Sequence, residues 1–256
     1  MAELTTIILT REKSDKITSC FNSLKSLRTR IIIIIDTKKD NTEAEMFAKN
    51  KKVKYFKHEI NNNFAMHREF ALSKVKTKYV FYIDDDEEVT QALIKDIKKI
   101  LSGEIEGNAF AVPRKNIIFG KEFKHTGQWP DYVARIFKKE KLNGFHGEVH
   151  EQPIVDGQIV HLKSPLIHYK HNDLSSMVEK TNKWSEIEAR LMFEAHHPPM
   201  TIARFASASF REFWLRMIQQ KAFLDGPEGI IYALYQIFSR FISYAKLWEM
   251  QLKLKS

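Results

Sequence analysis

The first ninety residues alternate short apolar runs with stretches in which apolar positions recur at helical spacing. The run RIIIIID at 30–36 has five isoleucines without polar alternation, which indicates a strand covered on both faces and hence a parallel sheet flanked by helices. Strands are predicted at 4–10, 30–36, 52–56 and 79–84, and helices at 11–27, 42–50 and 63–74. This alternation predicts a doubly wound α/β half-domain.

The pattern changes twice further along the chain. Between 108 and 171 it consists of short strands and loops rich in His, Trp and Gly, which we expect to add antiparallel strands to the sheet edge. From 173 to 256 it is helical, with helices predicted at 174–195, 201–223 and 228–252. We therefore expect an α/β domain over 1–172 followed by a helical extension over 173–256.

Composition narrows the class of protein. The 256 residues are 43% hydrophobic and 29% charged, as in globular proteins, and no apolar run is long enough to cross a bilayer. We expect a cytoplasmic protein, since the first residues lack the features of a cleaved leader. Cys20 is the single cysteine, so it can form neither an internal disulfide nor a zinc site, and we expect it to be buried in a helix. The net charge of +9 favours anionic partners without choosing among them.

Five consecutive carboxylates, Asp84 to Glu88, follow the apolar strand YVFYI. In parallel sheets ligands lie beyond the carboxyl ends of the strands, where Thr10, Asp36 and Asp84–Asp86 should converge. Carboxylates suit hard cations, so Mg²⁺ or Mn²⁺ is the expected compensating charge. The alternative is that these acids cap the following helix, and Glu87 and Glu88 are assigned that role.

Two further residues strengthen the prediction of a nucleotide site. Asp36 ends a strand, where a carboxylate can meet a base edge or a ribose hydroxyl, and Arg68 begins a helix, where a guanidinium can face a diphosphate. The simpler alternatives are that Asp36 caps a helix and that Arg68 is solvated.

Together these motifs carry a family resemblance. The segments TTIILT, IIIIIDTKKDNTEA, NNNFAMHREFAL and YVFYIDDDEEV resemble the nucleotide-sugar half of inverting family 2 glycosyltransferases with the GT-A fold. The segments RKNIIFGKEFKHTGQWPDYVARIFKK, FHGEVHE, PLIHYKH and KAFLDGPEGIIYAL are similar to the branch of lipopolysaccharide-core β-glucosyltransferases. The departures are lysines in DTKKDNT, where Ser and Gly are usual, and Glu69, where Asn is common.

The resemblance implies a GT-A catalytic domain over 1–172, with a nucleotide-sugar half at 1–90 and an acceptor half at 108–172. It implies that Thr10, Asp36 and Asp85 contact the nucleotide sugar and that Arg68 lies by the pyrophosphate. Asp84 would touch the ribose or the metal, and Asp86 would bind the Mg²⁺ or Mn²⁺ ion directly. The ion would stabilise the departing nucleoside diphosphate.

An inverting transfer also needs a base that takes the proton of the acceptor hydroxyl. The segment GFHGEVHE offers two carboxylates, and in an extended chain Glu148 and His150 would share one face while Glu151 occupies the other. The VHE motif of the family favours Glu151 as the base, with Glu148 as the runner-up. His150 is assigned to shaping the site.

Three residues of the acceptor half are further candidates. His168 could complete the metal shell, or be a hydrogen-bonded structural residue. Trp129 could stack on a sugar ring, or pack in the core, and Asp131 could hold sugar hydroxyls.

The aromatic, basic helical tail could lie on an anionic membrane, pack against the catalytic domain or form a homo-oligomer. We expect a nucleoside-diphosphate sugar, with UDP-sugars first, as donor and a glycan or glycolipid of the cell envelope as acceptor. One rival interpretation is a sugar-nucleotide nucleotidyltransferase, whose glycine-rich loop is missing from LTREKSDK. The other is a basic nucleic-acid-binding module, which the carboxylate cluster disfavours. We therefore expect no nucleic-acid partner.

Overall fold

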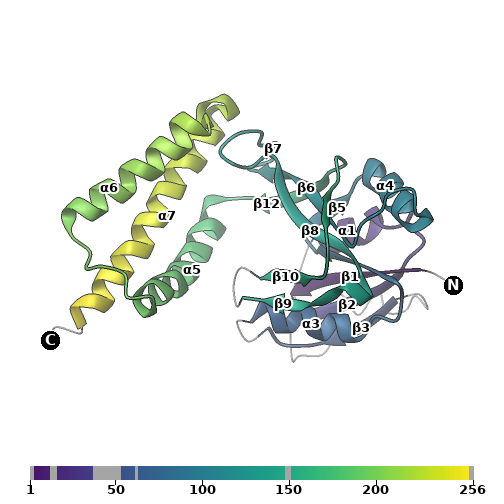
Figure 1. Cartoon of the computed structure of the whole chain (residues 1–256). Helices are drawn as coiled ribbons and strands as arrows, with labels where there is room; N and C mark the ends of the chain where they lie inside the picture. Colours follow the sequence, from purple (N-terminus) through teal and green to yellow (C-terminus); the bar gives the residue numbers. More distant parts are fainter. Residues whose placement is uncertain (1–2, 12–15, 37–52, 61–62, 148–150, 254–256) are drawn as a thin grey trace. The chain divides into compact units, whose positions relative to one another are not determined.

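The chain forms two compact units in a computed structural model (Figure 1). The structure describes residues 3–11, 16–36, 53–60, 63–147 and 151–253, so the helix predicted at 42–50 lies outside the described residues. The first unit comprises residues 1–114 and 131–168, and the second comprises 115–130 and 169–256. The division predicted after residue 172 stays a prediction.

The first unit contains a large sheet and its covering helices. Its elements are β1 (Leu4–Arg11), α1 (Ile17–Ser23), β2 (Arg30–Asp36), β3 (Val53–Lys57), α3 (Phe64–Ser73), β4 (Tyr79–Asp84), β5 (Glu87–Val89), α4 (Gln91–Ser102), β6 (Ala109–Ile118), β8 (Asp131–Lys138), a 3₁₀ turn at Lys139–Lys141, β9 (Leu142–His146), β10 (Gln152–Val155), β11 (Ile159–His161) and β12 (Leu166–His171). Strands β6 and β12 each end in the second unit.

The sheet order is β3-β2-β1-β4-β8-β6-β12-β5. The first four strands are parallel, with β1 between β2 and β4, while β8 joins β4 in antiparallel pairing. Strand β6 pairs antiparallel with β8, and β12 with β5. This confirms the predicted α/β sheet with antiparallel additions. A separate antiparallel pair, β9 and β10, forms a hairpin.

The isoleucine run of β2 supplies both faces of the sheet. Ile33 and Ile35 pack in the core that includes residues of α1 and α4, whereas Ile32 and Ile34 pack in the core that includes residues of α3. Side chains alternate across a strand, so a strand covered on both sides must be apolar at every position. Each such buried isoleucine stabilises the fold by about 1.5–3 kcal/mol.

The helix after the aspartates begins later than expected. Helix α4 begins at Gln91, and its N-cap is Thr90, whose Oγ1 accepts a hydrogen bond from the Leu93 amide at 3.1 Å. Glu87 and Glu88 lie in the short strand β5, and the first turn of α4 holds no acidic residue. The prediction that these glutamates cap the helix was wrong, because the hydroxyl of Thr90, two residues after Glu88, accepts the hydrogen bond from the first turn.

His67 in helix α3 and its neighbour His58 yield a prediction about acid stability. His67 is buried, its Nδ1 lies 3.1 Å from Nδ1 of His58, and burial and then the neighbouring His58 lower the pKa of His67 to about 4. The unfolded chain therefore binds this proton more strongly, and stability falls as the pH drops below about 6.5. We expect a loss of about 2 kcal/mol from this residue between pH 7 and pH 5.

Urea unfolding at the two pH values checks this prediction. Between pH 7 and pH 5 the unfolding free energy of His67→Gln should fall by about 2 kcal/mol less than that of the wild type. His146→Gln, whose side chain is exposed, should show the same fall as the wild type. An equal pH dependence in wild type and His67→Gln would contradict it.

The second unit is mainly helical. Its elements are the strand β7 (Lys121–Glu122), which pairs with the end of β6, helix α5 (Leu174–Glu194), helix α6 (Ile202–Phe213), a π-helical segment (Trp214–Gln219), a 3₁₀ turn (Ala222–Asp225) and helix α7 (Gly226–Lys253). A buried cluster centred on Ala189, Met200 and Leu247 joins residues of α5 and α7. Among the described residues, none of the helices combines the length and apolar character that a bilayer crossing requires.

Candidate active site

The carboxyl ends of the parallel strands bring predicted residues together. Thr10, at the end of β1, donates a hydrogen bond from Oγ1 to Oδ2 of Asp85 at 2.6 Å. The Asp85 amide in turn donates to the carbonyl of Leu9 at 3.1 Å, so the chain after β4 is held against β1. Asp36, at the end of β2, accepts the amide of Ile60 at 2.9 Å.

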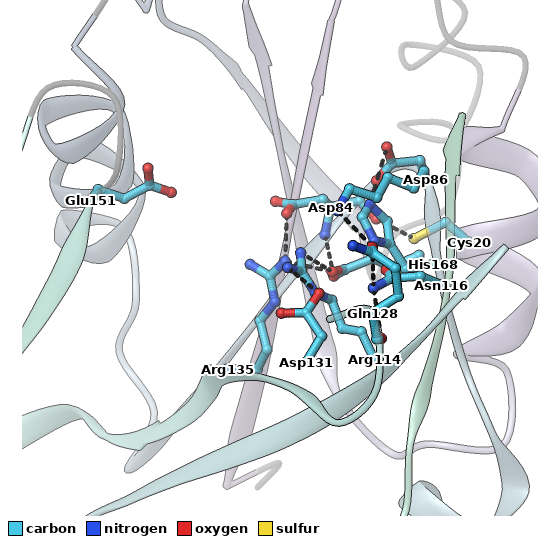
Figure 2. A network of polar contacts seen from close by, with 12 residues as sticks. Cys20, Asp84, Asp86, Arg114, Asn116, Gln128, Asp131, Arg135, Glu151 and His168 are labelled. Atoms are coloured by element: carbon cyan, nitrogen blue, oxygen red, sulfur yellow. Dashed lines mark hydrogen bonds and ion pairs between the residues drawn. The ribbon is translucent and has the colours of Figure 1, made fainter. Parts of the chain in front are cut away.

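The nearest charges that compensate the carboxylates are arginines (Figure 2). Arg135, from β8, donates through Nη2 to Asp84 Oδ2 and to Glu87 Oε1, both at 2.5 Å. The side chains of Arg135 and Glu87 are almost fully buried. The Asp84 amide also donates to Glu87 Oε2 at 3.1 Å, which closes the cluster on itself.

These contacts decide the charge of each carboxylate. Burial opposes ionisation of Asp84, but Arg135 and then Arg68 outweigh it and hold the pKa of Asp84 well below its ordinary range. Burial raises the pKa of Glu87, and Arg135 only partly offsets it. Breaking such a buried ion pair from one side leaves an uncompensated charge, so Arg135 should be costly to replace.

Arg68 links helix α3 to the predicted base. Its Nε donates to Glu151 Oε1 at 2.7 Å, and its Nη2 lies 3.4 Å from Asp84 Oδ1. The backbone carbonyl of Arg68 accepts the hydroxyl of buried Tyr82 at 2.9 Å, which fixes the helix on β4. The guanidinium also lies over the ring of Tyr82, 5.5 Å from its centroid. Arg68 therefore joins two predicted site carboxylates, one from each half of the first unit.

Glu69 fixes the hairpin that leads to Glu151. Its Oε1 accepts the backbone amide of Phe145 at 3.1 Å, which ties strand β9 to helix α3. The adjacent Gly144 has φ of 134°, and a Cβ placed there would lie 2.6 Å from Glu69 Oε1. Only glycine suits that backbone and leaves room for the carboxylate. The glutamate at this position thus has a structural use in this chain.

Arg114 and Asp131 form a second pair at the same place. Arg114 Nη2 lies 2.7 Å from Asp131 Oδ2, and its Nη1 lies 3.8 Å from Glu87 Oε1. Asp131 therefore stands beside the Arg135 cluster, as Figure 2 shows.

These groups open on a cavity of about 510 Å³ within the first unit. Its lining includes Arg68, Asp84, Arg114, Arg135 and Glu151. The volume is typical of small-molecule sites, and three guanidinium groups with two carboxylates suit a polar, anionic ligand.

Asp86 and His168 stand apart from the arginines. His168 Nε2 lies 3.8 Å from Asp86 Oδ2, and burial, followed by Asp84 and Glu87, raises the pKa of Asp86 to about 7. A carboxylate oxygen and an imidazole nitrogen this close together are ligand types that suit a divalent cation, which would relieve this repulsion. Within the described part of the chain, no group of three or more His, Cys, Asp or Glu side chains is arranged to hold a metal.

The structure confirms the prediction that Cys20 is buried in a helix. It lies in α1, is fully buried, and its Sγ lies 3.5 Å from the carbonyl of Asp84. Burial, followed by the nearby Glu87 and Asp85, raises the pKa of the thiol well above its ordinary value. It is therefore a neutral packing residue.

The remaining predicted residues lie elsewhere. Trp129 belongs to the second unit, and its side chain is 39% exposed, so it is not a core residue. Glu148 and His150 lie outside the described residues.

The sequence interpretation missed Arg114, Arg135 and the buried role of Glu87. A signal was available, because Arg135 interrupts the apolar stretch YVARIF of a predicted strand. A buried arginine requires an acidic partner, and Asp84–Glu88 is the densest run of acidic residues in the sequence.

Comparisons with known proteins agree with this geometry. Residues 5–164, more than half of the chain, match the family described as Glycosyl transferase family 2. An uncharacterized glycosyltransferase of Rickettsia bellii is 22% identical over 264 residues, covering 98% of this chain and 88% of that protein. The lipopolysaccharide core biosynthesis glycosyltransferase LpsC of Rhizobium meliloti is 23% identical over 199 residues, covering 76% and 72%.

A solved structure shares the fold. The crystal structure of S. aureus TarS 1-349 in complex with UDP aligns with a TM-score of 0.50 and 13% identity. The alignment covers 100% of this chain and 92% of that one. It supports the GT-A-like architecture expected from the sequence.

Proposed function

The chain belongs to glycosyl transferase family 2, and on that premise we propose that it transfers a sugar, with inversion, from a nucleoside diphosphate to a hydroxyl of a cell-envelope glycan or glycolipid. The family decides against the nucleotidyltransferase and the nucleic-acid-binding module. The observation that carries the proposal is Arg68, which bridges Glu151 and Asp84 at the cavity wall. The similarity to LpsC supports a lipopolysaccharide-core acceptor.

A UDP-sugar is the proposed donor. The UDP complex of TarS, which shares the fold, supports this choice. Thr10, Asp36, Asp84 and Asp85 lie at or just after the ends of three neighbouring parallel strands, where nucleotides bind in open α/β sheets. Arg68 would stabilise the diphosphate and Asp131 would contact the sugar or the acceptor, while the sugar-stacking role of Trp129 stays a prediction.

Glu151 is the proposed base. The acceptor oxygen would attack the anomeric carbon as the bond from that carbon to the diphosphate breaks, and the hydroxyl proton would pass to Glu151. Arg68 Nε engages Oε1 at 2.7 Å, so the proton would go to Oε2. Glu148 is the alternative base, and His150 would shape the site beside it.

Asp86 and His168 are the proposed ligands of a Mg²⁺ or Mn²⁺ ion. When bound, such an ion supplies electrostatic stabilisation of the charge that grows on the leaving diphosphate. The spacing of the two side chains and the crowding of carboxylates around Asp86 support this role.

We expect Asp86→Asn to lose the metal dependence of donor binding. In wild type, Mn²⁺ should tighten UDP binding by at least about tenfold, because the ion offsets the repulsion between carboxylates and diphosphate. Calorimetric titration of UDP with and without Mn²⁺ measures the effect. Asp96→Asn, in helix α4, is the matched control. Unchanged Mn²⁺ dependence in Asp86→Asn would remove Asp86 from the metal site.

The transfer itself is tested with a panel of nucleotide sugars. The enzyme should release nucleoside diphosphate slowly from one donor alone and faster when truncated lipopolysaccharide is added. Mass spectrometry of the acceptor should show the mass of one added sugar. Failure of every donor to give either product would contradict the proposal.

A further inference from the structure

The outward face of helix α6 and the π-helical segment that follows it is apolar. Exposed fractions are 89% for Ile202, 63% for Phe210, 40% for Phe213 and 48% for Trp214. Helical spacing puts these residues on one side of the helix, while Ala208 is buried on the other. Large apolar side chains gathered on one exposed face mark an interaction surface.

The exposed charges of the same segment are all positive. Arg204 and Arg211 are exposed and seven residues apart, so they share one side of the helix, where Arg211 lies one turn from Trp214. Each is two residues from an apolar member, Ile202 or Phe213, so the arginines flank the apolar side on its Trp214 edge. Lys221 is exposed further along. The two acidic residues of the segment 201–225 are both engaged. Glu212 pairs with Arg216 at 2.7 Å, and Asp225 is buried, where it accepts the amide of His125 at 2.8 Å.

A hollow of about 750 Å³ adjoins this face inside the second unit. Phe210 and Trp214 line it from the α6 side and Tyr244 from α7. Its charged lining consists of Arg211, Arg240 and Glu212, and Glu212 is paired with Arg216. Figure 1 shows α6 and α7 side by side in this unit. Aromatic and aliphatic walls with cations suit an amphiphile that has an anionic head group.

Helix α5 provides the contrast within the same unit. It also exposes apolar residues such as Leu191, but its exposed charges are of both signs, including Glu179, Glu186 and Arg190. A general surplus of surface lysine and arginine therefore does not explain the α6 face.

We propose that the α6 face, formed by the apolar side chains of Ile202, Phe210, Phe213 and Trp214 with Arg204 and Arg211 along one edge, docks on the surface of an anionic phospholipid bilayer. Tryptophan and phenylalanine would enter the interface while the arginines remain at the head groups. A soluble polyanion would explain the arginines but not four exposed apolar side chains. If two copies of the chain paired through this face, the arginines of one copy would lie near those of the other. The segment has no exposed acidic residue to offset that repulsion, so self-association is disfavoured.

Flotation of the full chain with lipid vesicles tests the proposal. The protein should float with vesicles of equal parts phosphatidylcholine and phosphatidylglycerol, and remain unbound with phosphatidylcholine alone. Raising the salt concentration should weaken binding. Arg204→Glu with Arg211→Glu should lower the partition coefficient by at least about tenfold, because each cation near an anionic surface contributes about that order of attraction. Phe210→Ser with Trp214→Ser should cause a similar loss.

Three controls keep the outcome decisive. Arg204→Lys with Arg211→Lys should retain binding, and Leu191→Ser, an equally exposed apolar change on α5, should leave it unaltered. Circular dichroism and thermal melting of each variant exclude unfolding as the cause of lost binding. Binding to neutral vesicles as strong as binding to anionic vesicles would overturn the proposal. So would a failure to bind vesicles accompanied by dimers of the chain that Phe210→Ser dissociates. None of these measurements requires the transfer reaction, so they stand independently of the proposed function.

Discussion

Glu151→Gln should lower the rate of sugar transfer by about 10²- to 10⁴-fold, the contribution of a general base. The amide keeps the shape of the side chain and can still accept a hydrogen bond from Arg68, which lies 2.7 Å from Oε1 in the wild type. It cannot take a proton from the acceptor hydroxyl. Donor affinity should therefore change little, and calorimetry with UDP alongside a transfer assay separates the two effects.

Glu106→Gln is the matched control for this change. Glu106 is an exposed carboxylate of the same unit, and its replacement should alter neither activity nor donor binding. If Glu151→Gln lost UDP affinity and activity together, Glu151 would act in donor binding rather than as the base. If it retained full activity, Glu148 would become the candidate.

Arg135→Met should destabilise the first unit by about 3–5 kcal/mol. The change keeps much of the side-chain volume but leaves Asp84 and Glu87 without the guanidinium that now lies 2.5 Å from each. Glu87 is fully buried and would have to take up a proton or draw water into the core. Urea unfolding followed by far-ultraviolet circular dichroism measures the loss, because the tryptophans of the chain all belong to the second unit.

Two variants distinguish this cause from a general loss of charge. Arg190→Met removes an exposed arginine whose partner Glu194 lies 4.0 Å away, and should cost less than about 1 kcal/mol. Adding Glu87→Gln to Arg135→Met should recover part of the stability, since it removes one orphaned charge. A cost below about 1 kcal/mol for Arg135→Met would show that the cluster does not depend on Arg135.

The parallel sheet could be predicted because its sequence signal is local. Five isoleucines followed by Asp36 require burial on two faces, and the structure places alternate isoleucines in two different cores. The strand ends could be predicted for the same reason, and Thr10 and Asp85 do meet there. The start of α4 was less accurate, because acidic residues also favour the first turn of a helix, so the sequence alone allows a start at the glutamates as well as at Thr90.

Arg114 and Arg135 could not be placed beside Asp84 from the sequence, although a charge within the apolar stretch YVARIF indicated that Arg135 needs an acidic partner. Arg135 and Asp84 are 51 residues apart, and their contact depends on the antiparallel pairing of β4 with β8. Charge repulsion among the acids was correctly inferred, but the assignment of a metal as their sole compensation was incomplete. Arg135 and Arg68 already hold the pKa of Asp84 low, whereas burial keeps the pKa values of Glu87 and Asp86 raised.

Glu69 illustrates a residue whose meaning depends on its neighbour in space. It departs from the family pattern, in which Asn is common, and the structure shows that its carboxylate holds the amide of Phe145. No sequence signal connects the two positions, because 76 residues separate them.

Consecutive residues of α3 therefore hold both ends of one short segment: Glu69 secures Phe145 before it and Arg68 secures Glu151 after it. A single turn of helix α3 therefore sets the proposed base against strand β9, so a substitution at Glu69 or Arg68 should disturb the same hairpin from either side.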